Sequence, residues 1–395
     1  MTALFNFLRD WTQPIIGGKN FTDWKKQNYN LQKVEIKNKK LAKELEIACQ
    51  KDGFLTYSEY LQIEQFGKNG YHAHHTDHGF TPTYKLWSEA IFSYLQKNSI
   101  HTVIDIGPGN KYLAESLYKL SQKNNFPILW NGVEVENNFR ETIKNTFKDK
   151  KYKSFFGRIE ESIDKLPYYN NALIIFSYVL DSIPPEIFIH TRKEIGYPDK
   201  MLGIKINNGY LEEFILTDSN LLSKNIFMKE GAVIYKNNSF DLSSWMISPM
   251  QRAYITLQSF SDTCNVLKKV KNPSLLIMDE IRTSPEVLSS EHFLSPLYLN
   301  IKNRYSFTPQ KAYERAGELL FYYPLFLSCL LSFLKDSGFQ NIQFGPEEKM
   351  VSELLNKTWI PDKRFRYFLC YGLLSNKRGQ SKKTIRLLFP QPQKL

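Results

Sequence analysis

Two glycines and two acidic residues have types and spacing suited to binding a nucleoside. The stretch Asp105-Ile-Gly-Pro-Gly109 joins an acid to two glycines, and Glu134 follows 25 positions after the second glycine. Glycines let a backbone turn tightly and approach a ligand with no Cβ atom in the way. A carboxylate at this distance is placed to accept hydrogen bonds from the two hydroxyls of an adenosine ribose. The pattern therefore indicates a cofactor that contains adenosine.

Two cofactor classes use this geometry, dinucleotides and S-adenosylmethionine, and two residues distinguish them. The dinucleotide fingerprint GxGxxG requires a third glycine, and this chain has Tyr112 at that position. Asp105 would repel a pyrophosphate, but it could attract the ammonium group of a methionine moiety directly or through water. The alternative is a structural glycine turn with an unrelated acid downstream. The residues together favour S-adenosylmethionine.

Strands that alternate with helices are needed to position these residues, and the sequence predicts them from residue 100 onward. The expected strands are 103–106, 129–135, 172–177 and 274–279, and the expected helices after the first two are 112–122 and 138–147. Such alternation is typical of a parallel sheet with helices on its faces. Asp105 and Glu134 would then lie at the carboxyl ends of neighbouring strands. We expect an α/β, Rossmann-like core formed by residues 99–185 and 251–395.

Three further regions surround this core. Residues 1–50 are polar and lysine-rich, which predicts an N-terminal helical extension. Residues 51–98 predict a helical cap, with one helix that begins at the capping box Thr56-Tyr-Ser-Glu59 and another over 85–95. Residues 186–250 are too long for a loop and predict a small β-rich substrate lid.

Turn signals in the lid are Asn207-Asn-Gly209 and Lys236-Asn-Asn238. After residue 279 we expect helix through Leu334, and we expect residues 365–372 to form a final edge strand.

Histidines are concentrated in the loop that follows the first cap helix. His72, His74, His75, Asp77 and His78 could supply metal ligands, because alternate residues of an extended segment share a face. The spacing of closed structural metal sites is absent. We therefore expect no metal, and we favour a loop at the cleft mouth that faces solvent or contacts substrate.

An ordered set of motifs resembles the MidA family of S-adenosylmethionine-dependent methyltransferases, which includes the mitochondrial arginine methyltransferase needed for assembly of respiratory complex I. The resemblance spans about residues 52–350 and rests on motifs at 53–60, 70–71, 80–82, 105–109, 132–135, 175–184, 248–249 and 275–279. It implies a class I methyltransferase fold with S-adenosylmethionine as cofactor. The cofactor-binding residues it implies are Asp105, Gly107, Gly109 and Glu134, with Thr81 in the loop that closes over the cofactor.

Departures from the family pattern bear on the substrate. The third glycine of the family turn is Lys111 here, and the family Asn-Glu pair is Ser177-Tyr178. A guanidinium substrate needs carboxylates for bidentate hydrogen bonds, so the missing glutamate argues against arginine methylation. Tyr178 could orient a hydroxyl, carboxylate or amine acceptor, or it could be a buried tyrosine with a satisfied hydroxyl. Asp181 could contact the acceptor or remove its proton, or it could cap a helix that begins at Ser182.

Composition limits the remaining function classes. The net charge is +12, but the basic residues are spread along the chain, which favours a solvated surface over a nucleic-acid interface. The four cysteines lack paired spacing and fit a reducing compartment, and the chain lacks a signal peptide pattern or a membrane span. We expect a cytoplasmic methyltransferase that acts on a protein side chain or a small molecule, with a homodimer left open. The alternatives are an RNA methyltransferase and an inactive binding or assembly factor.

Overall fold

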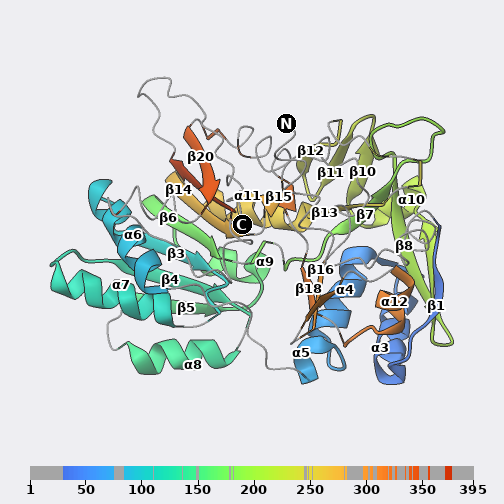
Figure 1. Ribbon diagram of the computed structural model, residues 1–395, viewed down its shortest axis with the longest axis horizontal. Helices are drawn as coiled ribbons and strands as arrows, with labels where there is room; N and C mark the ends of the chain where they lie inside the picture. Colours follow the sequence, from blue (N-terminus) through green and yellow to red (C-terminus); the bar gives the residue numbers. More distant parts are fainter. Residues whose placement is uncertain are drawn as a thin grey trace, which may run out of the picture.

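The structure of the chain is a computed structural model, and Figure 1 shows two lobes side by side. One lobe is built on a seven-stranded sheet, and the other on a six-stranded sheet with helices beside it. The residues described are 30–74, 84–109, 111–135, 137–147, 151–177, 179–180, 182–243, 247, 249–250, 252–279, 281–282, 297–300, 303–305, 309–318, 320–322, 325–326, 334, 338–339, 341–346, 355 and 370–375.

The seven-stranded sheet has the order β20-β21-β14-β6-β3-β4-β5. Its strands are β3 Thr102–Ile106, β4 Leu129–Glu134, β5 Tyr152–Phe156, β6 Tyr169–Ser177, β14 Val270–Asp279, β20 Asn341–Pro346 and β21 Cys370–Ser375. Strands β5, β4, β3, β6 and β14 run parallel, whereas β21 is antiparallel to both of its neighbours. The predicted Rossmann-like α/β core is confirmed.

Helices cover both faces of this sheet, so its strands are apolar on both sides, as is usual for parallel sheets. The helices α6 Tyr84–Lys97, α7 Tyr112–Lys123 and α8 Asn137–Thr146 lie on one face, and α11 Leu257–Leu267 lies on the other. Ile91 and Leu117 share a core with Val103, while Phe260 shares the opposite core with Ile104. The adjacent β3 residues therefore point to opposite faces.

The C-terminal part of the chain differs from the sequence prediction. The sequence predicted an edge strand over 365–372, of which the structure describes residues 370–372. These residues belong to β21, so the edge position was wrong, because β21 lies between β14 and β20. The expected helical stretch from 280 to 334 was also wrong where the structure describes strands in it. The described residues there form α12 Pro309–Glu314 and the strands β15 Ile281–Arg282, β16 Leu297–Asn300, β17 Asn303–Tyr305, β18 Leu320–Tyr322 and β19 Leu325–Phe326. Short apolar runs do not distinguish strand from helix by their periodicity.

The second lobe combines the inserted region with segments from before and after it. Its six-stranded sheet contains β1 Lys33–Glu35, β2 Leu55–Thr56, β7 Glu186–Ile189, β8 Lys200–Asn207, β9 Tyr210–Ile215 and β13 Arg252–Ile255. A smaller sheet contains β10 Ile226–Lys229, β11 Ala232–Tyr235 and β12 Asn238–Asp241. Strand β1 lies in the segment expected to form an N-terminal extension, and it pairs with β9 of the inserted region.

Both predicted turns of the inserted region join neighbouring antiparallel strands. Asn208 and Gly209 connect β8 to β9 with φ of 51° and 79°. Lys236 and Asn237 connect β11 to β12 with φ of 46° and 66°. Two consecutive residues with positive φ are the conformation that tight hairpins require, and asparagine and glycine tolerate it well.

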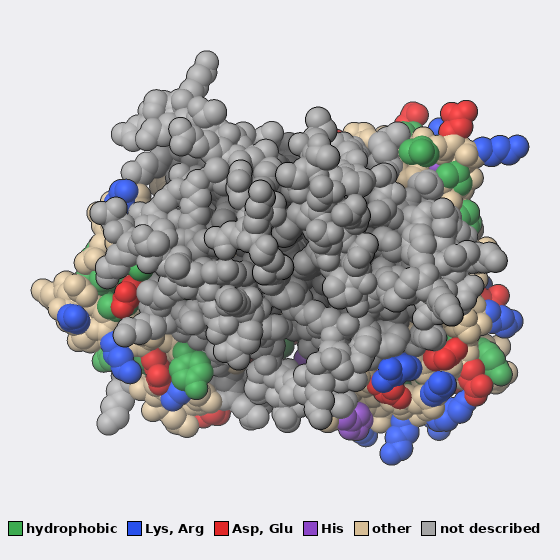
Figure 2. Space-filling model, viewed as in Figure 1, with side chains coloured by type: hydrophobic (Ala, Val, Ile, Leu, Met, Phe, Trp, Pro, Cys, Tyr) green, Lys and Arg blue, Asp and Glu red, His purple; other side chains and the backbone are tan. Residues whose placement is uncertain are grey.

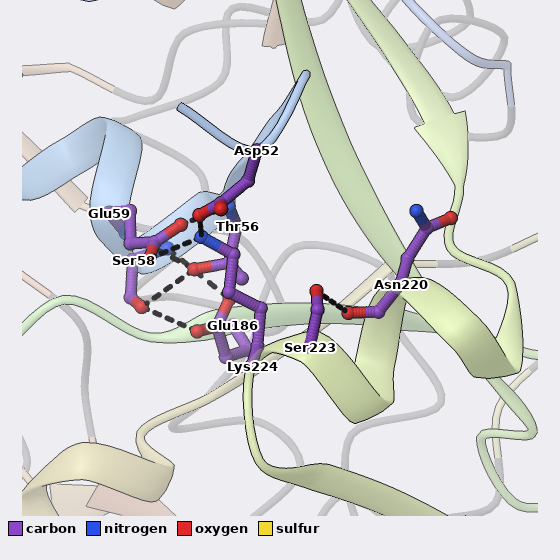
Figure 3. Close-up of polar contacts among 8 residues, drawn as sticks. All are labelled: Asp52, Thr56, Ser58, Glu59, Glu186, Asn220, Ser223 and Lys224. Carbon is purple, nitrogen blue, oxygen red and sulfur yellow. Dashed lines mark hydrogen bonds and ion pairs between the residues drawn. The ribbon is translucent and has the colours of Figure 1, made fainter. Parts of the chain in front are cut away.

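Polar contacts join the inserted region to helices that lie beside it, among α3 Lys39–Gln50, α4 Tyr57–Phe66 and α5 Tyr71–His74. The predicted capping box of Thr56 and Glu59 is present at the start of α4. Lys224, which follows α10 Asp218–Ser223, places its Nζ atom 2.8 Å from both Asp52 and Glu59 (Figure 3). Glu186 of β7 accepts hydrogen bonds from the backbone and hydroxyl groups of Ser58. These contacts link α4, α10 and β7.

Across the described part of the chain, no helix is both long enough and apolar enough to span a membrane.

Candidate cofactor site

The turn after β3 holds two glycines in the left-handed region. Gly107 has φ of 61° and Gly109 has φ of 62°. A Cβ atom on Gly107 would lie 2.3 Å from Cγ2 of Val179, whereas a Cβ atom on Gly109 would meet no described residue within 4 Å. Gly107 is therefore required for close packing of the turn against the segment after β6. Gly109 instead borders open space that a ligand could enter.

Glu134 at the end of β4 is held against this turn. Its Oε2 atom accepts a hydrogen bond of 2.8 Å from the backbone N–H of Gly109, and its Oε1 atom accepts one of 2.7 Å from Val135. Each carboxylate oxygen has a second lone pair that can accept a hydroxyl group. The structure thus brings together the glycine and the acid that the sequence selected, and it fixes the orientation of the carboxylate. Its role in ribose binding stays a prediction.

Asp105 lies at the end of β3 with its side chain fully buried. Its Oδ2 atom accepts a hydrogen bond of 3.3 Å from the indole Nε1 of Trp130, while its Oδ1 atom has no partner among the described residues. Burial raises the pKa of Asp105 to about 7; the Trp130 hydrogen bond lowers this pKa and the charge of Glu134 raises it. A buried acceptor without a partner is uncommon and suggests a ligand group at that position.

Lys111 leaves the turn intact although the family has glycine at the equivalent position. Its φ of −84° and ψ of −6° are ordinary right-handed values, so glycine is not required there. Its Nζ atom lies 2.9 Å from Glu115 on α7 and 3.5 Å from the hydroxyl of Thr146 on α8. The Lys111 side chain therefore lies against α7 and α8, the helices that flank the turn.

The candidate catalytic residues Tyr178 and Asp181 lie outside the described residues, as does Thr81. Their neighbour Val179 is described, and it is the residue that Gly107 packs against. The N–H of Ser182 donates to the carbonyl of Val179 over 3.2 Å, so the chain turns directly after β6. Val179 therefore lies beside the glycine turn.

Only the first part of the histidine run is described. The ring of His72 stacks on that of Phe66 with a centroid distance of 4.8 Å, and His74 is exposed at the end of α5. His75, Asp77 and His78 lie outside the described residues. Among those that are described, no three His, Cys, Asp or Glu side chains form a group that could hold a metal ion. The function of the run stays a prediction.

Sequence reasoning missed the partner of Asp105. Trp130 precedes Gly132 by two positions on β4, so both residues point to the same face of the sheet. A Cβ atom on Gly132 would lie 2.3 Å from Cη2 of Trp130, so the indole occupies the space that a larger residue would fill. The Trp-x-Gly spacing in a predicted strand is the only sequence signal of this contact.

Comparisons with known proteins find similar structures but no matching family model or curated protein. One similar structure is a candidate methyl transferase from Burkholderia thailandensis bound to S-adenosyl-homocysteine, with a TM-score of 0.60, 11% identity, and coverage of 86% of this chain and 92% of that chain. Another is an uncharacterized protein of the same superfamily and organism, with a TM-score of 0.58, 12% identity and the same coverage. The chain therefore shares the fold of these proteins over most of its length.

Proposed function

We propose that the protein is an S-adenosylmethionine-dependent methyltransferase and a divergent member of the MidA family. The observation that carries the proposal is the hydrogen bond from Gly109 to Glu134 at the carboxyl ends of two adjacent parallel strands. Ligands of open α/β sheets bind at such strand ends. A further support is the shared fold of the Burkholderia thailandensis protein that holds S-adenosyl-homocysteine.

The residues of the turn fit this cofactor. The open side of Gly109 admits an adenosine, and Glu134 presents an oriented carboxylate to the ribose hydroxyls. Asp105 offers its Oδ1 atom, which has no partner among the described residues, to the ammonium group of the methionine moiety. The cofactor would supply a methyl group that its positive sulfonium makes reactive. The protein then contributes mainly by holding the acceptor in line with that methyl group in a site without water.

The segment after β6 is the proposed source of acceptor contacts, because Val179 within it packs against the cofactor turn. We assign Tyr178 to orienting the acceptor, and Asp181 to contacting it or removing its proton. Ser177 and Tyr178 replace the carboxylate that a guanidinium would need. The acceptor class that fits is therefore an amine, hydroxyl or carboxylate on a protein side chain or a small molecule, methylated on nitrogen or oxygen.

An RNA substrate is the second candidate, motivated by the net charge of +12. Figure 2 shows Lys and Arg side chains mixed with Asp and Glu on the described part of the visible face, near the end of the second lobe. A mixed surface supports RNA binding less than a continuous basic one would. Steep weakening of RNA binding with added salt would favour this second candidate.

The third candidate is a protein that keeps the fold but lost catalysis, as a binding or assembly factor. Lys111 and the missing Asn-Glu pair motivate it, and the ordinary backbone angles of Lys111 weaken the first of these motives. We also propose a cytoplasmic location, because the four cysteines of the sequence lack the paired spacing of a disulfide framework. Whether the protein forms a homodimer stays an open question.

Calorimetric titration with S-adenosyl-homocysteine tests the proposed cofactor site. We expect micromolar affinity for the wild type and at least about tenfold weaker binding for Glu134→Gln, a loss of about 1.4 kcal/mol. The control Glu141→Gln removes an exposed carboxylate on α8 and should bind like the wild type. If the folded wild type does not bind, the enzyme proposal fails and the binding-factor candidate gains support.

A further inference from the structure

Trp130 connects two strands of the core through a polar contact with Asp105. Its indole is fully buried on β4 and stacks on the ring of Tyr152 at a centroid distance of 6.1 Å and an interplanar angle of 16°. Gly132 leaves room beside the indole, as the 2.3 Å approach of a Cβ atom shows. With its plane fixed between these neighbours, the indole directs its N–H across to Asp105 on β3.

This contact leaves the Asp105 carboxylate half satisfied. Oδ2 accepts the indole N–H at 3.3 Å, and Oδ1 has no partner among the residues that the structure describes. A buried carboxylate oxygen without a partner costs free energy, which a cation or a donor at that position would recover. Because one oxygen is held by a rigid side chain, the direction of the other is set as well.

We propose that Trp130 is a positioning residue for cofactor binding, which aims the Asp105 carboxylate at the ammonium group of the methionine moiety. This inference rests on the proposed function and deepens it, because it assigns the control of that contact to a residue that does not touch the cofactor. The strand neighbours of Asp105 are Gly132 on β4 and Ile175 on β6, which carry no charge.

Protonation of Asp105 then controls affinity. The carboxylate binds an ammonium group, but the protonated acid does not, so affinity falls as the pH drops below the pKa of Asp105, about 7. Among the described residues, the charge that acts on Asp105 is that of Glu134, which raises its pKa. The indole N–H lowers the same pKa. Removing this N–H should therefore move the loss of affinity to higher pH.

Titrations with S-adenosyl-homocysteine from pH 5.5 to 8 test the inference on the wild type, Trp130→Phe and Asp105→Asn. For the wild type, we expect affinity to weaken by about tenfold per pH unit below the pKa of Asp105. Trp130→Phe keeps an aromatic ring. As the pH is lowered, its affinity should begin to weaken at a higher pH than that of the wild type, and at pH 8 its affinity should approach the wild-type value. Asp105→Asn should bind weakly and without this pH dependence. It is also the control for the ligand, because any pH dependence that remains in this variant would come from titration of S-adenosyl-homocysteine itself.

Equal weakening of Trp130→Phe at every pH would overturn the inference, because a structural role alone would act that way. A wild type whose affinity does not change with pH would overturn it too, while leaving the proposed function intact. Failure of the wild type to bind at any pH would instead overturn the proposed function on which the inference rests.

A spectroscopic measurement remains decisive if Trp130→Phe does not fold. In protein labelled with nitrogen-15 at its six tryptophans, one indole N–H signal should titrate with the midpoint found for binding and should shift when S-adenosyl-homocysteine is added. The same signal should stop titrating in Asp105→Asn. If no indole signal titrates with that midpoint, Trp130 does not position Asp105.

Discussion

At the scale of single residues, the glycine turn contains two positions with the same backbone conformation and different surroundings. Gly107 and Gly109 both have φ near +60°, yet Gly107 faces Val179 and Gly109 faces open space. The sequence predicted that both glycines matter but could not separate their roles, because the residue that distinguishes them is 72 positions away along the chain (179 − 107). Stability and cofactor binding should therefore be separable by two matched substitutions.

Alanine at each glycine tests this separation. For Gly107→Ala we expect a loss of about 2–4 kcal/mol in the free energy of unfolding, from the left-handed backbone and the overlap with Val179. For Gly109→Ala we expect a loss of about 1 kcal/mol from the backbone alone. Only Gly109→Ala should remain well folded while its affinity for S-adenosyl-homocysteine drops at least about tenfold.

Urea unfolding and calorimetry measure the two effects on the same samples. Wild-type affinity in Gly109→Ala would mean that the cofactor does not occupy the open side of this turn.

At the scale of elements, a buried carboxylate joins the start of helix α4 to the inserted region. Glu186 on β7 is buried and accepts hydrogen bonds from Ser58 at the start of α4. Burial raises the pKa of Glu186 to about 7, whereas the hydrogen bonds from Ser58 lower it. The capping box was predictable because it is local in the sequence. The Ser58–Glu186 contact was not, because it joins positions 128 residues apart.

The raised pKa makes the stability of the protein depend on pH. The folded state keeps the proton on Glu186 where the unfolded chain releases it, so this contribution is complete below about pH 4.5 and is lost as the pH rises through about 7. In Glu186→Gln, the carbonyl can accept the Ser58 N–H and the amide can donate to its hydroxyl. We expect the variant to lose less stability than the wild type between pH 5 and 8, by on the order of 1–3 kcal/mol.

Urea unfolding at pH 5, 6, 7 and 8 measures this difference. Other groups also titrate, so the comparison between the two proteins isolates Glu186. Parallel curves of stability against pH for the wild type and Glu186→Gln would contradict the prediction. They would show that Glu186 has the same pKa in the folded and unfolded states.

At the scale of the whole molecule, the parts that the sequence predicted are those with local patterns. The strands β3 and β4 with the helices after them, and the two hairpin turns, follow from periodicity and from Gly and Asn residues. Pairing between distant segments could not be predicted. Strand β1 pairs with β9 of the inserted region, and β21 lies between β14 and β20. These pairings depend on how the whole sheet packs and not on local sequence patterns.

We assign cofactor binding and the choice of methyl acceptor to different lobes. The seven-stranded sheet carries Asp105, Gly109 and Glu134, which we assign to the cofactor. The second lobe contains the inserted region, in which we place the choice of acceptor. This division predicts that substitutions within β8 and β9 alter methyl acceptor use more than cofactor affinity.

A crystal structure of the protein with S-adenosyl-homocysteine tests the central claim most directly. We expect the ribose hydroxyls within about 2.6–3.2 Å of the Glu134 carboxylate. The adenosine should cross the open side of Gly109, and the ammonium group should lie at Oδ1 of Asp105. A ligand bound elsewhere, with no contact to Glu134, would contradict the claim that this turn is the cofactor site of a methyltransferase.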